Sequence, residues 1–178
     1  MTAVHQFARA LGRLIELALV CLLVGMVIMV FGNVVLRYGF NSGITISEEL
    51  SRYFFVWLTF TGAVLAFAEH GHIGVETVVK RMSRKGRTVC LALVNAIILV
   101  CAAVIFWGTW LQHPINASMT GAVVGISMIW VYGIGYFTAL GIGLIALLRL
   151  ARILTGGVTD EELARFAGEV DWHRAGGE

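Results

Sequence analysis

Charged side chains are scarce in this sequence. Of its 178 residues, 13% are Asp, Glu, Lys or Arg, whereas 58% are hydrophobic. A soluble domain usually carries about 25% charged residues. The length suits one domain, and a membrane environment explains the lack of charge better than an unusually large core does. We therefore predict an integral membrane protein and not a soluble enzyme.

Proline and cysteine are also rare. The one proline is Pro114, so little interrupts long helices. The three cysteines are Cys21, Cys90 and Cys101, all within apolar runs. Their odd number and their spacing suit neither a disulfide framework nor a zinc site. We interpret them as small buried apolar side chains.

Four apolar stretches are long enough to cross a bilayer. An α-helix rises about 1.5 Å per residue, so roughly 20 apolar residues span the hydrocarbon core. Because lipid offers no hydrogen-bond partners to the backbone, each stretch should be a helix. The predicted spans are about 15–36, 50–68, 89–111 and 126–148. Residues 1–154 then form a four-helix transmembrane domain, and 155–178 form a short cytoplasmic tail with a capping-box pattern at 159–162.

The N-terminus resembles a signal peptide, because Arg9 and Arg13 precede an apolar stretch. That stretch is longer than the roughly 7–15 residues of a cleavable hydrophobic region. We therefore expect the first span to stay in the membrane, with its N-terminus in the cytoplasm.

The distribution of Lys and Arg predicts the orientation of all four spans. The N-terminal segment, the loop between spans two and three and the C-terminal segment hold two, five and four of the 13. The other two loops hold only Arg37 and Arg52, and residues 112–125 form an outer loop without charge. The positive-inside rule places both termini and the middle loop in the cytoplasm. Aromatic residues near the predicted outer ends agree with this frame: Tyr38, Tyr53, Trp107, Trp110, Trp130 and Tyr132.

The interiors of the spans contain no ionisable side chain; Asn33 and Asn95 are the most polar residues there. A proton-coupled carrier usually has an intramembrane carboxylate. The chain therefore fits a partner subunit better than a complete transporter. Gly135, Ala139 and Gly143 recur every four residues on one face of the last span, where small residues let a partner helix approach closely.

Charged residues gather where the first span ends and the second begins. Arg37 closes the first span, and Glu48, Glu49 and Arg52 open the second, which Ser47 can cap. On a helix both glutamates can pair with Arg52, three or four residues later, and Arg37 could join them from the end of the neighbouring helix. The cluster could be an ion-pair network that sets the depth of the spans, or a contact surface for another chain; the two roles are compatible.

No cofactor site is expected. His70 and His72 flank Gly71, but this spacing is not a recognised ligand pattern, and no histidine lies within a span as haem ligation would require. The sequence has no phosphate-binding loop, no serine–histidine–acid set and no basic aromatic patch for nucleic acid. The basic segment 80–87 is better explained as a topology determinant facing anionic lipid.

Three motifs resemble one family of membrane subunits. The runs NVVLRY at 33–38, SEELSRY at 47–53 and HIGVE at 72–76, with Gly62 and Ala63 in an aromatic span, resemble the small, DctQ-like permease subunit of tripartite ATP-independent periplasmic (TRAP) transporters. The resemblance covers residues 10–152. It implies a bacterial inner-membrane subunit that scaffolds a large permease. It also implies that the large permease holds the substrate and sodium sites, and that a periplasmic binding protein delivers an organic acid.

The resemblance also indicates which residues form the functional surface. We expect Asn33, Arg37, Glu48, Glu49 and Arg52 to order the outer ends of the first two spans and to contact the large subunit. Two other functions stay open. A self-sufficient homo-oligomeric transporter would need an ionisable core residue, and a membrane anchor of a redox complex would need paired intramembrane histidines.

Overall fold

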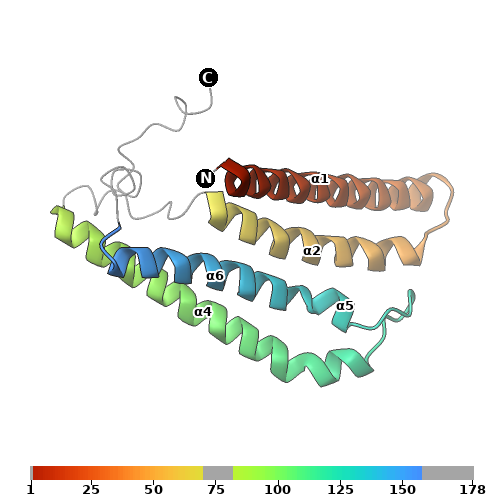
Figure 1. Ribbon diagram of the computed structural model, residues 1–178. Helices are drawn as coiled ribbons and strands as arrows, with labels where there is room; N and C mark the ends of the chain where they lie inside the picture. Colours follow the sequence, from red (N-terminus) through yellow and green to blue (C-terminus); the bar gives the residue numbers. More distant parts are fainter. Residues whose placement is uncertain (1, 70–81, 158–178) are drawn as a thin grey trace. The chain divides into compact units, whose positions relative to one another are not determined.

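The computed structural model describes residues 2–69 and 82–157, and these form five helices (Figure 1). They are α1 (Thr2–Gly39), α2 (Thr45–Glu69), α4 (Arg84–Ser118), α5 (Ile129–Tyr132) and α6 (Ile134–Leu154). Four helical stretches are long and apolar enough to cross a membrane: Gly12–Gly39, Thr45–Ala68, Arg84–Ser118 and Ile129–Leu154. This confirms the predicted all-α membrane protein with four spanning helices. His70, His72 and the predicted tail helix lie outside the described residues.

Two compact units divide the chain. One combines Met1–Leu65 with Ile105–Thr138, and the other combines Ala66–Val104 with Ala139–Glu178. Three of the helices, α2, α4 and α6, contribute residues to both units. Each unit is described below by its own contacts.

Several helix ends differ from the predicted ones. The third spanning helix, α4, continues to Ser118 with Pro114 inside it, so the predicted outer loop from residue 112 begins only at Met119. Proline has no backbone N–H and so removes one hydrogen bond of the helix. Only about one turn follows Pro114, so the loss is confined to the end of α4. At the other end of this loop, Ile126 is not helical, and the last span is divided into α5 and α6 at Gly133.

In the first unit, α1 and α2 lie side by side (Figure 1) and are joined by a hydrogen bond from a side chain to the backbone. The hydroxyl of Ser47 donates to the carbonyl oxygen of Met29 at 2.7 Å, and the Phe54 ring packs against Gly25. Because α2 already begins at Thr45, Ser47 lies inside its first turn. The predicted cap is therefore wrong, and Ser47 instead holds the two helices together.

In the second unit, Arg149 of α6 binds the C-terminal turns of α2. Its guanidinium donates to the carbonyl oxygens of Phe67 and Ala68 at 3.2 and 3.1 Å and lies over the Phe67 ring. The last carbonyls of a helix lack partners within the helix, and a cation there also complements the helix dipole. Deeper in this unit Asn95 is completely buried, and its amide donates to the carbonyl oxygen of Leu91.

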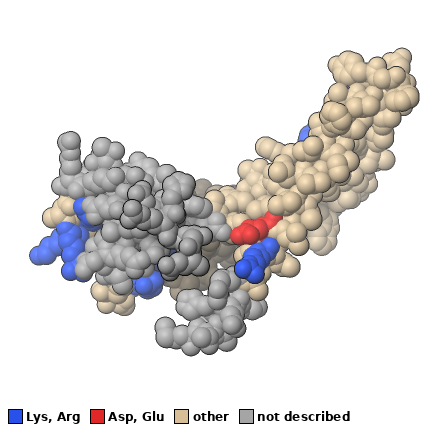
Figure 2. Space-filling view, turned by 90° about the horizontal axis from the view of Figure 1, so that it is seen from above, with Lys and Arg blue, Asp and Glu red and all other residues tan. Residues whose placement is uncertain are grey.

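The surface of the spans is apolar. On the face shown in Figure 2, most of the described surface is formed by residues other than Lys, Arg, Asp and Glu. Large side chains such as Leu17, Ile28 and Phe31 stand exposed along α1, as membrane-facing positions require. The prediction of buried cysteines is wrong for Cys21 and Cys101, which are exposed on this surface; lipid accepts a thiol as readily as a core does.

The small-residue stripe of α6 packs against α4 within the chain. In the first unit Gly135 faces Thr109, and a Cβ at Gly135 would lie 2.6 Å from the Thr109 hydroxyl oxygen. In the second unit a Cβ at Gly143 would lie 3.5 Å from the Cβ of Ala102, an ordinary contact, and Ala139 is buried. A role of these residues in contacting another chain stays a prediction.

These two glycines should respond differently to the same substitution. We expect Gly135→Ala to lower the free energy of unfolding by about 1–3 kcal/mol, as overpacking does, because the Thr109 hydroxyl is held by the carbonyl oxygen of Ile105. Gly143→Ala should leave it unchanged or raise it. Thermal unfolding in detergent measures both, and adding Thr109→Ala to Gly135→Ala should restore stability. Equal destabilisation by the two single changes would contradict this packing.

Candidate functional site

The site lies where α1 ends and α2 begins. The connection 40–44 turns the chain around: Asn41 adopts a positive φ of 50°, and the amides of Phe40 and Ser42 both bind the carbonyl oxygen of Leu36. Asparagine tolerates this left-handed conformation better than most residues do. The turn brings the last two turns of α1 next to the first two turns of α2.

Asn33 of α1 connects this helix to the turn 40–44 and to the first turns of α2. Its side-chain oxygen accepts a hydrogen bond from the amide of Ile44 at 2.8 Å, and its side-chain nitrogen donates to Glu48 at 3.1 Å. Only 8% of Asn33 is exposed. A buried amide with both ends satisfied fixes the positions of its partners. Asn33 therefore sets the path of the turn and the orientation of Glu48.

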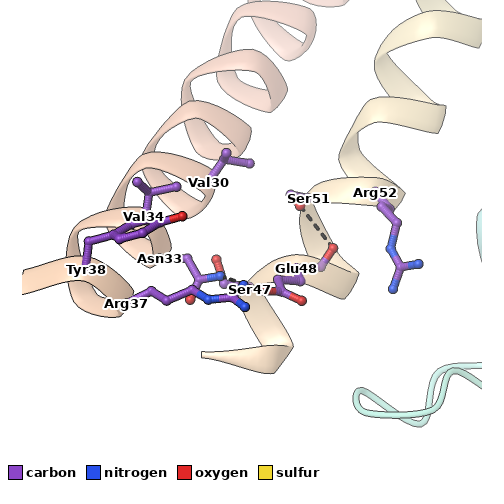
Figure 3. Close-up of a pocket in the computed structure, with 9 residues that line it drawn as sticks. All are labelled: Val30, Asn33, Val34, Arg37, Tyr38, Ser47, Glu48, Ser51 and Arg52. Carbon is purple, nitrogen blue, oxygen red and sulfur yellow. Dashed lines mark hydrogen bonds and ion pairs between the residues drawn. The ribbon is translucent and has the colours of Figure 1, made fainter. Parts of the chain in front are cut away.

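Glu48 faces α1 and lines a pocket. Its carboxylate lies 3.8 Å from the guanidinium of Arg37, and both side chains are more than half exposed. Figure 3 shows Arg37 and Glu48 pointing toward one another, with Arg52 apart from them one turn farther along α2. The pocket has a volume of about 530 Å³ and combines an apolar wall with charged and polar side chains; its lining residues are Val30, Asn33, Val34, Arg37, Tyr38, Ser47, Glu48, Ser51 and Arg52.

Glu49, the next residue, is buried and binds a different segment. It is 4% exposed, and one carboxylate oxygen accepts hydrogen bonds from the amides of Val123 and Val124 at 2.7 and 3.2 Å. The other oxygen accepts the hydroxyl of Tyr53. Successive backbone amides form a concavity suited to an anion. A buried carboxylate needs this number of donors, because burying an unpaired charge costs several kcal/mol.

The segment that Glu49 binds is a short hairpin, residues 119–128. Thr120 and Ser127 form an antiparallel bridge, and the amides of Gly121 and Met128 bind the carbonyl oxygens of Ile126 and Met119, both at 2.9 Å. Gly121 must lack a side chain, because a Cβ there would overlap the Glu49 carboxylate and the Tyr53 hydroxyl. We call this segment the 119–128 hairpin.

The predicted ion pairs of Arg52 with the two glutamates are wrong. Among the described residues the ion pair of this cluster joins Arg37 to Glu48, and Arg52 is exposed without an ion pair within 4 Å. The helix turns Glu48 and Glu49 toward different neighbours, which hold them by hydrogen bonds. Tyr53 and Gly121 were missed as members of the site. Helical spacing could have suggested Tyr53, which lies four residues after Glu49 on α2. For Gly121 the available signal was a charge-free connection with two glycines, Gly121 and Gly125.

The other polar residues of the described part form no comparable site. The ring of His113 lies 3.3 Å from the Tyr136 hydroxyl, at an exposed position. Among the described residues no group of three His, Cys, Asp or Glu side chains could hold a metal ion.

The sequence places the chain in a family. Residues 26–156 match the model of the DctQ component of tripartite ATP-independent periplasmic transporters. The chain belongs to this family. Two Haemophilus influenzae proteins named TRAP transporter small permease proteins are similar to it, at 36% identity over 152 residues and 30% over 127 residues. These matches cover 85% and 71% of this chain, and 92% and 77% of the relatives.

A third relative carries a substrate in its name. The C4-dicarboxylate TRAP transporter small permease protein DctQ of Vibrio cholerae is 29% identical over 90 residues, which cover 50% of this chain and 39% of the relative. As a member of the DctQ family, this chain is a small permease subunit of a TRAP transporter and a multi-pass membrane protein. The matched range contains the charged residues Arg37, Glu48, Glu49 and Arg52, which we call the 37–52 cluster, and also the 119–128 hairpin.

The two adjacent glutamates should differ in their effect on stability. Glu49→Gln replaces one carboxylate oxygen by an NH2 group, which cannot accept a hydrogen bond from the Tyr53 hydroxyl or from the amides of Val123 and Val124. We therefore expect the free energy of unfolding to fall by about 1–3 kcal/mol. Glu48→Gln removes a half-exposed ion pair and should cost about 0–1 kcal/mol. Thermal unfolding of the two variants in the same detergent tests this. If Glu48→Gln were the more damaging change, the buried carboxylate would not be the main stabilising contact.

Proposed function

We propose that this chain scaffolds the large permease of a TRAP transporter in the bacterial inner membrane. Membership of the DctQ family is the observation that carries the proposal. The absence of ionisable side chains from the span interiors supports it. A subunit without such groups is suited to bracing a partner that holds the substrate and the coupling ion, which we expect to be sodium.

The outer ends of α1 and α2 form the surface that contacts the large subunit in this proposal. Arg37, Glu48 and Arg52 are exposed and can reach another chain, whereas Asn33 and Glu49 are buried and act by positioning. Charged groups at an interface favour the correct partner and speed encounter more than they add affinity. The same surface can help to receive the periplasmic binding protein. Gly135, Ala139 and Gly143, whose spacing lets a partner helix approach closely, are further contact residues in this proposal.

The transported compound is an organic acid in this proposal. The name of the Vibrio cholerae relative makes a C4-dicarboxylate the first substrate to test. Selection of the substrate would lie with the binding protein and the large subunit. A self-sufficient homo-oligomeric carrier and a membrane anchor of a redox complex are the competing functions, and neither has a supporting residue among the spans.

Co-purification followed by uptake tests this function. The tagged chain is expressed with the large permease encoded beside it, purified and reconstituted into liposomes with a sodium gradient and the binding protein. We expect the two chains to elute together and uptake to require both. Transport by this chain alone, without a partner, would refute the scaffold function.

Reversal of the exposed charge at Arg52 should impair assembly without unfolding the chain. Arg52 makes no ion pair among the described residues, but its charge acts on the Glu49 carboxylate, and Arg52→Glu places a third acid near Glu48 and Glu49. We therefore expect the free energy of unfolding to fall by only about 0.5–1 kcal/mol. We expect the amount of co-purified large subunit, or the rate of uptake, to fall at least tenfold. Ser42→Glu, which adds an acid to the exposed turn nearby, is the control and should have a smaller effect. Normal assembly and uptake with Arg52→Glu would overturn the role of this surface.

Reporter fusions test the predicted orientation. Alkaline phosphatase, which is active only outside the cytoplasm, should be active when fused after Ser42. Green fluorescent protein should fluoresce when fused after Gly86, because the middle loop carries the basic residues that stay in the cytoplasm. The opposite pattern at both positions would invert the topology.

A further inference from the structure

The 119–128 hairpin is apolar to an unusual degree for a connection between helices. No Asp, Glu, Lys or Arg occurs from Gln112 to Leu148. Around the hairpin, Met119, Val123 and Ile126 are 54%, 47% and 39% exposed, and Trp130 directly after it is 71% exposed. A loop in water is normally polar, so these side chains call for an apolar environment.

Three backbone amides at the tip of the hairpin are bound within the chain. The amides of Val123 and Val124 bind Glu49, and the amide of Gly125 binds the carbonyl oxygen of Gly121 at 3.1 Å. In water these amides would find partners in the solvent. Away from water, irregular backbone is tolerated only where its polar groups are paired. These three bonds reduce the number of amides at the tip that need water, which favours a place at the interface.

The position of Glu49 places the hairpin near a boundary of the hydrocarbon. Glu49 and Glu69 are about 20 residues apart on α2, a distance of roughly 30 Å along the helix, which equals the thickness of the hydrocarbon core. The hairpin is tied to α2 at this level by Glu49. A second bond at the same end joins the indole nitrogen of Trp57 to the carbonyl oxygen of Trp130 at 3.1 Å.

We propose that the tip of the 119–128 hairpin inserts into the interfacial region of the lipid leaflet on the side where α1 joins α2. Glu49 is the positioning residue, since its carboxylate holds the tip in the inserted conformation. The hairpin contains no cationic side chain. The depth of insertion should therefore depend on the apolar surface of the hairpin and not on the anionic lipid content of the leaflet. This inference does not depend on the identity of the partner subunits.

Spin-label accessibility measures the depth of the tip. In the full chain with Cys21, Cys90 and Cys101 changed to alanine, single cysteines replace Val123, Ser42 and Leu140 in turn and carry a nitroxide. In phosphatidylcholine vesicles, oxygen should relax the label at 123 several-fold more effectively than a water-soluble nickel chelate does. Ser42, in the polar turn, is the matched control and should show the reverse. Replacing half of the lipid by phosphatidylglycerol should leave the value at 123 unchanged.

The Glu49→Gln variant tests the positioning role. It should shift the label at 123 toward the value at Ser42, while the label at Leu140, on the exposed face of α6, keeps its accessibility and so reports an intact membrane fold. A label at 123 that the nickel chelate reaches as readily as it reaches Ser42 in the unaltered chain would overturn the proposal.

Photo-crosslinking gives a second measurement that keeps the native cysteines. A benzophenone amino acid at position 123, activated in intact membranes that also contain the large permease, should yield a product heavier by one phospholipid. The opposite result is a product joined to the large permease. If, in addition, oxygen and the nickel chelate both reach the spin label at 123 less well when the large permease is present, the hairpin docks on protein. That result would also overturn insertion into lipid.

Discussion

The need to pair backbone polar groups away from water governs this structure. Within the spans the four long helices satisfy this need by themselves. At their ends side chains complete it: Arg149 binds the last carbonyls of α2, and Glu49 binds the amides of the 119–128 hairpin. Both side chains are charged, and charged partners form stronger hydrogen bonds than neutral ones do. These two charged side chains therefore complete the backbone hydrogen bonding beyond the helices themselves.

Neighbouring positions in the 37–52 cluster have opposite roles because successive residues on a helix point about 100° apart. Glu48 turns toward α1, where Asn33 and Arg37 hold it at the edge of an open pocket. Glu49 turns toward the hairpin and is buried. One residue thus belongs to a surface that another molecule can reach, and the next belongs to the support beneath it. Substitutions at the two positions should not be interpreted alike.

A scaffold subunit needs rigidity at its contact surface more than it needs chemistry. The turn 40–44 is held by Asn33, the helices on either side by Ser47, and the hairpin by Glu49. Each contact joins two different segments of the chain through a buried or half-buried polar group. Ordering such a surface before a partner arrives reduces the entropy lost on binding. This arrangement is consistent with the role we propose for a small TRAP permease subunit.

Composition and hydrophobic length alone determined the all-α class and the number of spans, because lipid permits few other solutions for long apolar stretches. The motifs at 33–38 and 47–53 were also sufficient to indicate the family, and they contain most of the charged cluster. Tertiary structure decided how that cluster is connected. The sequence allows Arg52 to pair with both glutamates and Arg37 to join from the first span, and the fold gives Glu48 to Arg37 and Glu49 to the hairpin. Helical spacing states which residues could meet along one helix, but it contains no information about the partners that another segment brings. Residues 119–128 become such a partner only when the fold carries them to α2, and for that reason Gly121 was missed. Tyr53 lies four residues after Glu49 on α2, so helical spacing alone could have suggested it.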